Sequence, residues 1–483
     1  FERPVRSASV DPDSKLVRYL MAGREPCHQL HWDRRHAAVV VGGPATTRPP
    51  EERPAMIGDR TSTPRTQIVL MKLWLALAVC SILSNSALAV AEVARATPDA
   101  GGDGQAREPM TDASLAPHQI ELLERAFDVA SSYPLDPHIK NRSQAQMWVV
   151  EACLELDQPA RAAKYGKQIV NWRQGQAMAE VGHYCIEHGW LDEAHQYLKR
   201  AALVAGAEGL EPWRSVRVRQ RVLEGYETLG LADQAEEVQG EMWDHEVEDR
   251  IDAMRALRGG RDRFDEQMEQ LKQLTATENY DLWVYAAHQY ARLYDRYYTE
   301  ADLRDRVEEA LNEHLDQLHW FVDHEILVKM AQTAIEAGDD ANADRLLDRA
   351  HEVVKTSTWP WDEGITAMAE LAPLWVEADR KEKARSQAEA TLELYEAQRE
   401  HIRNYDRAKA LRPIAAAYQS LGDESKATEL YSRVVDLGTV NPNIRPRTND
   451  LTQTCLSMAL HGFEPDDKLW PRIRQIYQEL VSK

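Results

Sequence analysis

Two groups of residues in this 483-residue sequence have side chains of the types that bind metal ions. The groups are His183, Cys185 and His188, and Glu241, His245 and Glu248. If the first group lies on a helix, its two histidines are five residues apart and point about 140° away from each other, which does not suit a shared site. The second group follows the spacing of one helix face, but Asp244, Glu246 and Asp249 surround it and indicate a solvated acidic face. We therefore expect no metal site and no cofactor.

The sequence also lacks the motifs that assemble common catalytic sites. It contains no G-x-S-x-G, no phosphate-binding loop, no G-x-G-x-x-G and no H-E-x-x-H. We therefore predict that the protein is not an enzyme.

One chemical pattern does recur along the chain, as a glutamate near the end of successive apolar-periodic segments. In four copies it lies two residues before the Gly or Asp that closes the segment, and in a fifth it lies three before. These residues are Glu155, Glu187, Glu336, Glu377 and, in the displaced copy, Glu227. Their recurrence near the turn residue identifies them as candidate binding residues.

Aromatic residues supply a second candidate site. Pro360 restrains the backbone between Trp359 and Trp361, and exposed tryptophan often anchors a partner or a sugar. Packing of this turn against a neighbouring helix is the alternative. A longer aromatic stripe has helical spacing and is predicted to pack in the core; it comprises Trp283, Tyr290, Tyr294 and Tyr297.

The elements that position these residues follow a repeating pattern. A Gly or Asp closes one segment, an Ala follows five residues later, and in two copies another Ala follows seven beyond. The full copies are Gly189, Ala194 and Ala201, and Gly338, Ala343 and Ala350; Gly230, Gly422, Asp157 and Asp379 begin partial copies. The Gly or Asp ends the first helix of a hairpin, and the alanines lie where the second helix crosses closely.

The pattern resembles the tetratricopeptide repeat over residues 143–440, most closely between Met178 and Gly206. An aromatic residue precedes several turns by four positions, as in that family: Tyr226, Trp375 and Tyr418. The resemblance implies an all-α solenoid of about eight antiparallel helix hairpins wound into a right-handed superhelix. We assign residues 116–483 to it and expect polar helical caps at residues 116–132 and 450–483.

The resemblance also assigns a place to the recurring glutamates. In repeats of this kind the end of the first helix faces the concave groove, so Glu155, Glu187, Glu227, Glu336 and Glu377 are predicted to line it. Such a groove favours a protein or peptide partner that is basic or neutral over an acidic one. Solvated helix ends are the alternative, although carboxylates at helix C-termini oppose the helix dipole.

The N-terminal region differs from the remainder. Residues 1–70 are rich in proline and show no helical or strand period, so we expect disorder and interpret them as an over-extended reading of upstream sequence. Residues 71–91 have the three parts of a signal peptide: Lys72, the apolar run Leu73 to Leu83, and small residues that permit cleavage before Val90 or Glu92. An uncleaved buried helix is the alternative. Residues 92–115 are predicted to be a flexible linker.

Charge and these features define the expected function. The 79 acidic and 58 basic residues give a net charge of -21, which disfavours nucleic acid as a partner. We predict a periplasmic or secreted, non-catalytic binding scaffold for proteins or peptides in the cell envelope, without a transmembrane anchor in the mature chain. The alternative is a secreted (α/α) toroid polysaccharide lyase or glycoside hydrolase, which would use paired carboxylates.

Overall fold

The computed structural model describes residues 110–482 except for 208, 241–254, 256, 258–259, 278 and 316. Within these residues every regular element is a helix, which confirms the all-α class. None of the described helices is both long enough and apolar enough to cross a membrane. The segments assigned to upstream sequence, to the signal peptide and to most of the linker lie outside the described residues.

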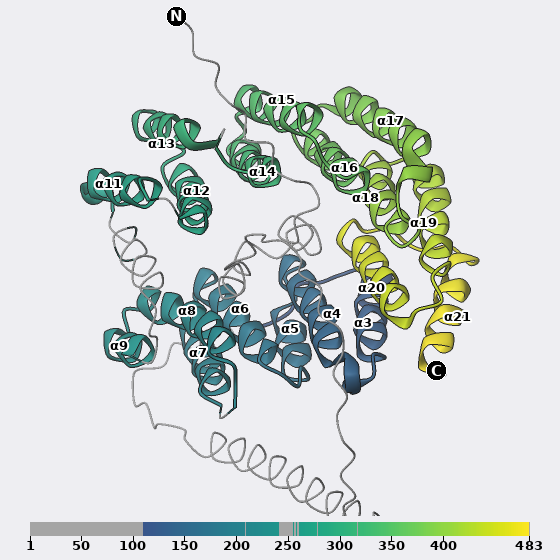
Figure 1. Ribbon diagram of the computed structural model, residues 1–483, viewed down its shortest axis with the longest axis horizontal. Helices are drawn as coiled ribbons and strands as arrows, with labels where there is room; N and C mark the ends of the chain where they lie inside the picture. The colour runs from purple at the N-terminus through teal and green to yellow at the C-terminus, as the bar shows by residue number, and fades with distance from the viewer. Residues whose placement is uncertain are drawn as a thin grey trace, which may run out of the picture. The chain divides into compact units, whose positions relative to one another are not determined.

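Most helices form antiparallel hairpins with their neighbour in sequence (Figure 1). The elements are α3 (Pro117–Ser131), α4 (Leu135–Glu155), α5 (Pro159–Gly166), α6 (Arg173–Glu187), α7 (Leu191–Ala205), α8 (Pro212–Thr228), α9 (Ala232–Gly240), η1 (Arg261–Arg263), α11 (Phe264–Thr275), α12 (Tyr280–Arg296), α13 (Ala301–Leu315), α14 (Trp320–Glu336), α15 (Asp340–Thr356), α16 (Trp361–Glu377), α17 (Lys381–Gln398), η2 (Arg399–His401), α18 (Arg407–Ser420), α19 (Glu424–Gly438), α20 (Ile444–Leu460) and α21 (Leu469–Val481).

The predicted turn residues adopt the left-handed backbone conformation that ends a helix. Positive φ angles occur at Gly189, Gly230, Gly338 and Gly422, and also at Asp157 and Asp379, where an aspartate replaces the glycine. The backbone then closes the turn: the Trp190 amide donates to the Cys185 carbonyl over 2.8 Å. Glycine adopts such a φ without strain, and Asp is among the few other residues that tolerate it. The turn positions predicted from the spacing are confirmed.

The alanines of the repeating pattern lie at helix crossings. Ala194, Ala201, Ala343 and Ala350 are fully buried. Within the α6–α7 hairpin the approach is so close that a Cβ added to Gly182 would lie 3.0 Å from the side chain of Leu198. Small residues are therefore needed for the two helices of a hairpin to pack together.

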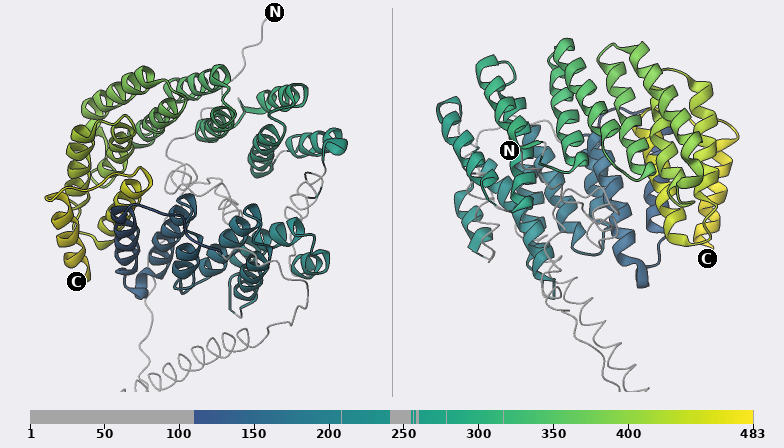
Figure 2. Two further views of the ribbon diagram at one scale, coloured as in Figure 1. Left: turned by 180° about the vertical axis from the view of Figure 1, so that it is seen from behind. Right: turned by 45° about the horizontal axis from the view of Figure 1, so that its top comes forward.

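The first helices of successive hairpins also contact one another, and together they form a row. In contact order the row is α12, α14, α16, α18, α20, α4, α6 and α8. The order shows that α20, near the end of the chain, is followed by α4, near its beginning. In Figure 2 the yellow helices near the end of the chain lie beside the dark blue helices near its described beginning.

The junction between the two ends of the chain is a helix pair made by α3 and α20. Gln119, near the start of α3, donates from Nε2 to the carbonyl of Ala459 at the end of α20 over 2.8 Å. The hydroxyl of Tyr133, just past the end of α3, lies 2.6 Å from the carbonyl oxygen of Arg445 at the start of α20. The two helices are therefore antiparallel, and α3 pairs with α20 as the second helix of a hairpin would. We call this pair the seam.

The seam joins the apolar cores of the two chain ends. Leu122, Leu123 and Phe127 of α3 belong to the same buried cluster as Leu451 and Cys455 of α20. We expected residues 116–132 and 450–483 to act as separate polar caps. Instead, α3 and α20 cover each other because both carry an apolar face, and α21 packs beside them on α19 and α20.

The seam predicts that α3 and α20 lose stability together. Leu123 is fully buried one turn after Gln119, so Leu123→Ala should leave a cavity and lower the free energy of unfolding by about 2–5 kcal/mol. Amide hydrogen exchange should then show lost protection in α20 as well as in α3. Leu198→Ala, an equally buried site in α7, is the control and should spare α20. Full protection of α20 in the Leu123 variant would contradict the seam.

Candidate functional site

The recurring glutamates lie at equivalent positions in the fold. Glu155, Glu187, Glu336 and Glu377 are the last residues of α4, α6, α14 and α16, and all four are exposed. Glu227 is the second-last residue of α8; its side chain is 13% exposed and accepts from Nε of Arg255 over 3.1 Å. We call these five residues the helix-end carboxylates. Four of them are exposed, and the fifth is engaged in an ion pair.

Two of these carboxylates lie at the ends of helices that contact each other. Helices α14 and α16 are in contact, and the pKa of Glu377 is raised above its ordinary value by partial burial and then by the charge of Glu336. The carboxyl of Glu155 reaches solvent, but its surroundings desolvate it in part and raise its pKa.

The carboxylates do not form an unbroken line. Between α16 and α4 in the row lie α18 and α20, whose last residues are Ser420 and Leu460. The carboxylates therefore fall into two groups at the ends of neighbouring first helices: Glu336 with Glu377, and Glu155 with Glu187 and the ion-paired Glu227.

A stack of aromatic rings lies beside the pair on α4 and α6. Tyr184 stacks on His188 with ring centroids 4.0 Å apart, and His188 stacks on Trp190 at 5.4 Å. The Tyr184 hydroxyl donates to Oδ1 of Asp157 over 2.6 Å and so ties the stack to the turn after α4. His188 is exposed, and the other two rings are partly exposed. We call Tyr184, His188 and Trp190 the aromatic stack.

Sequence reasoning missed the aromatic stack. The signal was present, since Tyr184 and His188 are four residues apart on one helix face and Trp190 directly follows the turn glycine. Aromatic faces attract cations, and so do carboxylates at helix C-termini. Together the stack, Glu155 and Glu187 form a surface suited to a lysine or arginine side chain.

The residues considered as metal ligands have separate partners. Nε2 of His183 lies 2.8 Å from the carbonyl oxygen of Arg221, Cys185 is buried, and His188 belongs to the aromatic stack. Glu241, His245 and Glu248 lie outside the described residues. Among the residues that the structure describes, no group of three potential ligands has a geometry that could hold a metal ion.

An ion-pair cluster links α6 to α8. Arg221 donates to both carboxylate oxygens of Glu180, over 2.9 and 2.6 Å, and also pairs with Glu224. Burial acts to raise the pKa of both carboxyl groups, but the Arg221 guanidinium outweighs it and holds each pKa below its ordinary value. Both glutamates therefore stay ionised, and the cluster fixes neighbouring first helices side by side.

The Trp359–Pro360–Trp361 turn packs against the start of α16. The Trp359 indole donates from Nε1 to the Val354 carbonyl, and its ring lies where a Cβ on Gly364 would be 2.1 Å away. Trp361 meets Trp359 edge to face at a centroid distance of 5.1 Å. Both tryptophans are partly buried. The structure thus gives Trp359 a packing partner, and a binding role for the turn stays a prediction.

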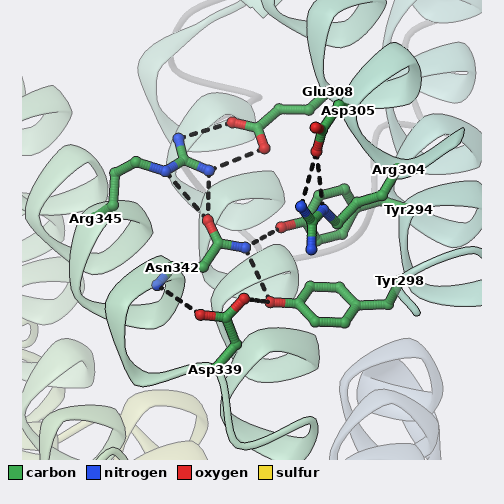
Figure 3. A network of polar contacts seen from close by, with 8 residues as sticks. All are labelled: Tyr294, Tyr298, Arg304, Asp305, Glu308, Asp339, Asn342 and Arg345. Carbon is green, nitrogen blue, oxygen red and sulfur yellow. Dashed lines mark hydrogen bonds and ion pairs between the residues drawn. The ribbon is translucent and has the colours of Figure 1, made fainter. Parts of the chain in front are cut away.

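A network of polar side chains joins α12, α13 and α15 (Figure 3). Asn342 donates from Nδ2 to the hydroxyls of Tyr294 and Tyr298 over 2.6 and 3.0 Å. On its other side Arg345 donates to the Asn342 carbonyl oxygen and pairs with Glu308 at 2.7 Å. The network borders a shallow hollow of about 700 Å³. Because both arginines in its wall, Arg304 and Arg345, are already paired, we assign the network to cohesion between hairpins.

The predicted aromatic stripe shares Tyr294 with this network. Tyr290, Tyr294 and Tyr297 are at most 3% exposed, and Trp283 donates from Nε1 to the Thr277 carbonyl over 2.6 Å. The core role predicted for the stripe agrees with this burial.

Comparisons with known proteins find matches only among solved structures. No family model matches the chain, and no curated protein matches it. A putative kinesin light chain from Podosopora anserina with nearly identical TPR-like repeats is 13% identical; the match covers 54% of this chain and 93% of that one, with a TM-score of 0.23. A circular tandem repeat protein with a novel repeat topology is 18% identical over 76% of this chain and 95% of that one, with a TM-score of 0.25.

Because these TM-scores are low, the superpositions carry no further conclusion. The chain itself consists of antiparallel helix hairpins with left-handed turns and buried alanines at their crossings. The tetratricopeptide-like resemblance inferred from the sequence is confirmed.

The coupled pair on α14 and α16 predicts a measurable change in titration. Glu336→Gln should lower the pKa of Glu377 toward its ordinary value, because the neighbouring negative charge is removed while the partial burial remains. Carbon-13 NMR of the glutamate carboxyl groups, assigned with Glu377→Gln, measures this. Glu187→Gln removes a charge from a different pair and should leave the pKa of Glu377 unchanged. Equal shifts in both variants would show that net charge, and not proximity, sets this pKa.

Proposed function

We propose that this chain is an exported, non-catalytic helical-repeat protein that binds a protein or peptide partner through the ends of its first helices. It forms about eight hairpins in a right-handed superhelix, follows a signal peptide at residues 71–91, and acts in the cell envelope as a periplasmic or secreted scaffold. Its partner is basic or neutral at the contacting segment. Helical repeats are suited to this task because successive hairpins present an extended surface.

The observation that carries the proposal is the surface formed by Glu155, Glu187 and the aromatic stack. A lysine or arginine side chain gains from the two carboxylates, from the negative ends of α4 and α6, and from the exposed ring faces. The pair Glu336 and Glu377 supplies a second such point. Two separated points favour an extended basic segment over a single small cation.

Nothing among the described residues favours the alternative of a secreted toroid lyase or glycoside hydrolase. The carboxyl groups of Glu336 and Glu377 are exposed at helix ends. Glycoside cleavage needs one carboxyl group held protonated and a second placed across the bond to be broken.

The proposal predicts that removing the helix-end charges weakens binding of a basic peptide. The five-site variant changes Glu155, Glu187, Glu227, Glu336 and Glu377 to Gln. Its affinity for a labelled peptide of alternating lysine and glycine should fall mainly through a slower association rate, and the affinity of the wild-type protein should fall with added salt, because exposed charges are screened beyond about 10 Å at 0.1 M. Stopped-flow fluorescence measures the association rate.

A matched variant separates local charge from net charge. It changes five exposed glutamates on the second helices to Gln: Glu236, Glu237, Glu309, Glu382 and Glu389. Its net charge equals that of the first variant, yet it should bind the peptide nearly as wild type does. Unchanged affinity in the helix-end variant, with a wild-type circular dichroism spectrum, would make these residues an ordinary solvated face.

The proposed export also predicts where the native protein begins. Because residues 71–91 have the three parts of an export signal, native material should begin at Val90 or Glu92. N-terminal sequencing of protein purified from the cell envelope or medium measures this. Recovery of a chain that still carries residues 1–70 would contradict both the cleavage and the upstream-sequence interpretation.

A further inference from the structure

Helices α6 and α8 begin with a cluster of arginine and tryptophan side chains that the proposed function does not use. The two helices are neighbours in the row (Figure 1). The cluster consists of Trp172 and Arg173 at the start of α6, and Trp213, Arg214 and Arg217 in the first turns of α8. We call it the arginine–tryptophan cluster.

The two indole rings and three guanidinium groups are interleaved. Trp172 and Trp213 meet edge to face with centroids 5.7 Å apart. Arg173 lies over the Trp172 ring at 4.8 Å and Arg214 over the Trp213 ring at 5.0 Å. Arg217 lies between the rings, at 5.9 Å from Trp172 and 5.5 Å from Trp213.

This stacking determines how the arginines meet a ligand. A guanidinium group that lies on an aromatic face keeps its N–H groups in its own plane, directed away from the ring. Such a group loses less conformational freedom when it binds a carboxylate through two parallel hydrogen bonds. The cluster is therefore a set of oriented donors for planar anions.

One part of the cluster is buried and another part is exposed to solvent. Trp172 is 5% exposed and Arg173 is 9% exposed, whereas Trp213 is 38% exposed. Glu211 precedes α8 and accepts from the Trp213 indole over 2.7 Å and from Arg214 over 3.2 Å, so a carboxylate already occupies part of the edge. Arg173 and Arg217 make other polar contacts as well, and a ligand would exchange with part of these.

We propose that the arginine–tryptophan cluster is a second binding surface, which takes an acidic protein segment carrying two or more carboxylates. Three arginines concentrate positive charge in a protein whose net charge is -21, and the amino-terminal ends of α6 and α8 add to it. Glu187 lies at the other end of α6, about 20 Å along the helix axis. The cluster and the helix-end carboxylates thus attract segments of opposite charge.

A protein segment fits the surroundings better than nucleic acid does. Glu180 lies about two turns beyond Arg173 and Glu224 about two turns beyond Arg217, and Glu211 lies beside Trp213. A continuous line of phosphates would meet these carboxylates, whereas spaced acidic side chains can alternate with them. Trp213 also offers a ring to an apolar residue of a peptide.

The test uses the full mature chain and a fluorescein-labelled peptide of five glutamates spaced by alanine, with one tyrosine. Fluorescence anisotropy should show at least tenfold weaker binding for the double variant Arg214→Gln, Arg217→Gln. Trp213→Ala should also bind several-fold more weakly although the charge is unchanged, and Trp213→Phe should retain most of the affinity. Arg217→Lys keeps the charge but loses the planar donor group, so its affinity should lie between wild type and the double variant.

Control measurements decide between the outcomes. Arg385→Gln with Arg472→Gln removes the same charge from the exposed surfaces of α17 and α21 and should leave peptide binding unchanged. An equal loss in this control, or no loss in the Arg214 and Arg217 variant, would overturn the proposal. So would tighter binding of a single-stranded oligonucleotide of equal charge with the same dependence on these residues. The five-site helix-end variant should still bind the acidic peptide, so failure of one site is distinguishable from failure of the other.

Discussion

The pairing of α3 with α20 is the contact on which the order of the whole helix row depends. In a simple repeat array the first and last hairpins face solvent, and each needs a polar cap. Here α20, the first helix nearest the C-terminus, is paired with α3 from the beginning of the chain as its second helix. Apolar contacts and the polar contacts of Gln119 and Tyr133 hold the two helices together. The row of first helices therefore runs without a break from α12 through α20 and α4 to α8.

On α6 and α8, charged side chains at the helix ends have the same sign as the partial charge of the helix dipole at that end. On α6, Arg173 is the first residue and Glu187 is the last, and α8 begins with Arg214 and Arg217. Positive side chains at a helix N-terminus and negative ones at the C-terminus oppose the usual stabilising arrangement. At exposed Glu187 no hydrogen bond or ion pair with another described residue offsets this cost. Arg221, held between Glu180 and Glu224, separates the two ends.

Much of the fold could be predicted from the sequence because turns and crossings require particular residue types. A left-handed turn needs Gly or Asp, and a close crossing needs Ala, so Gly189 with Ala194 and Asp379 with Ala384 marked the hairpins correctly. The seam could not be predicted, because Gln119 and Ala459 are 340 residues apart and neither belongs to a motif. The helix-end glutamates were placed correctly at first-helix ends, but their grouping depends on Ser420 and Leu460 in the intervening helices. The aromatic stack combines Tyr184 of α6 with two residues that follow that helix, and the arginine–tryptophan cluster combines the starts of two neighbouring helices.

The separation of the two seam helices in sequence has a consequence for biosynthesis. A ribosome adds about 5–20 residues per second, so α20 follows α3 by roughly 20–70 s. During that time the hairpins from α4 onward can fold on local contacts, and α3 can pack on α4, but the part of its apolar surface that contacts α20 stays uncovered. Until α20 is made, this part of α3 is an apolar surface to which a chaperone can bind.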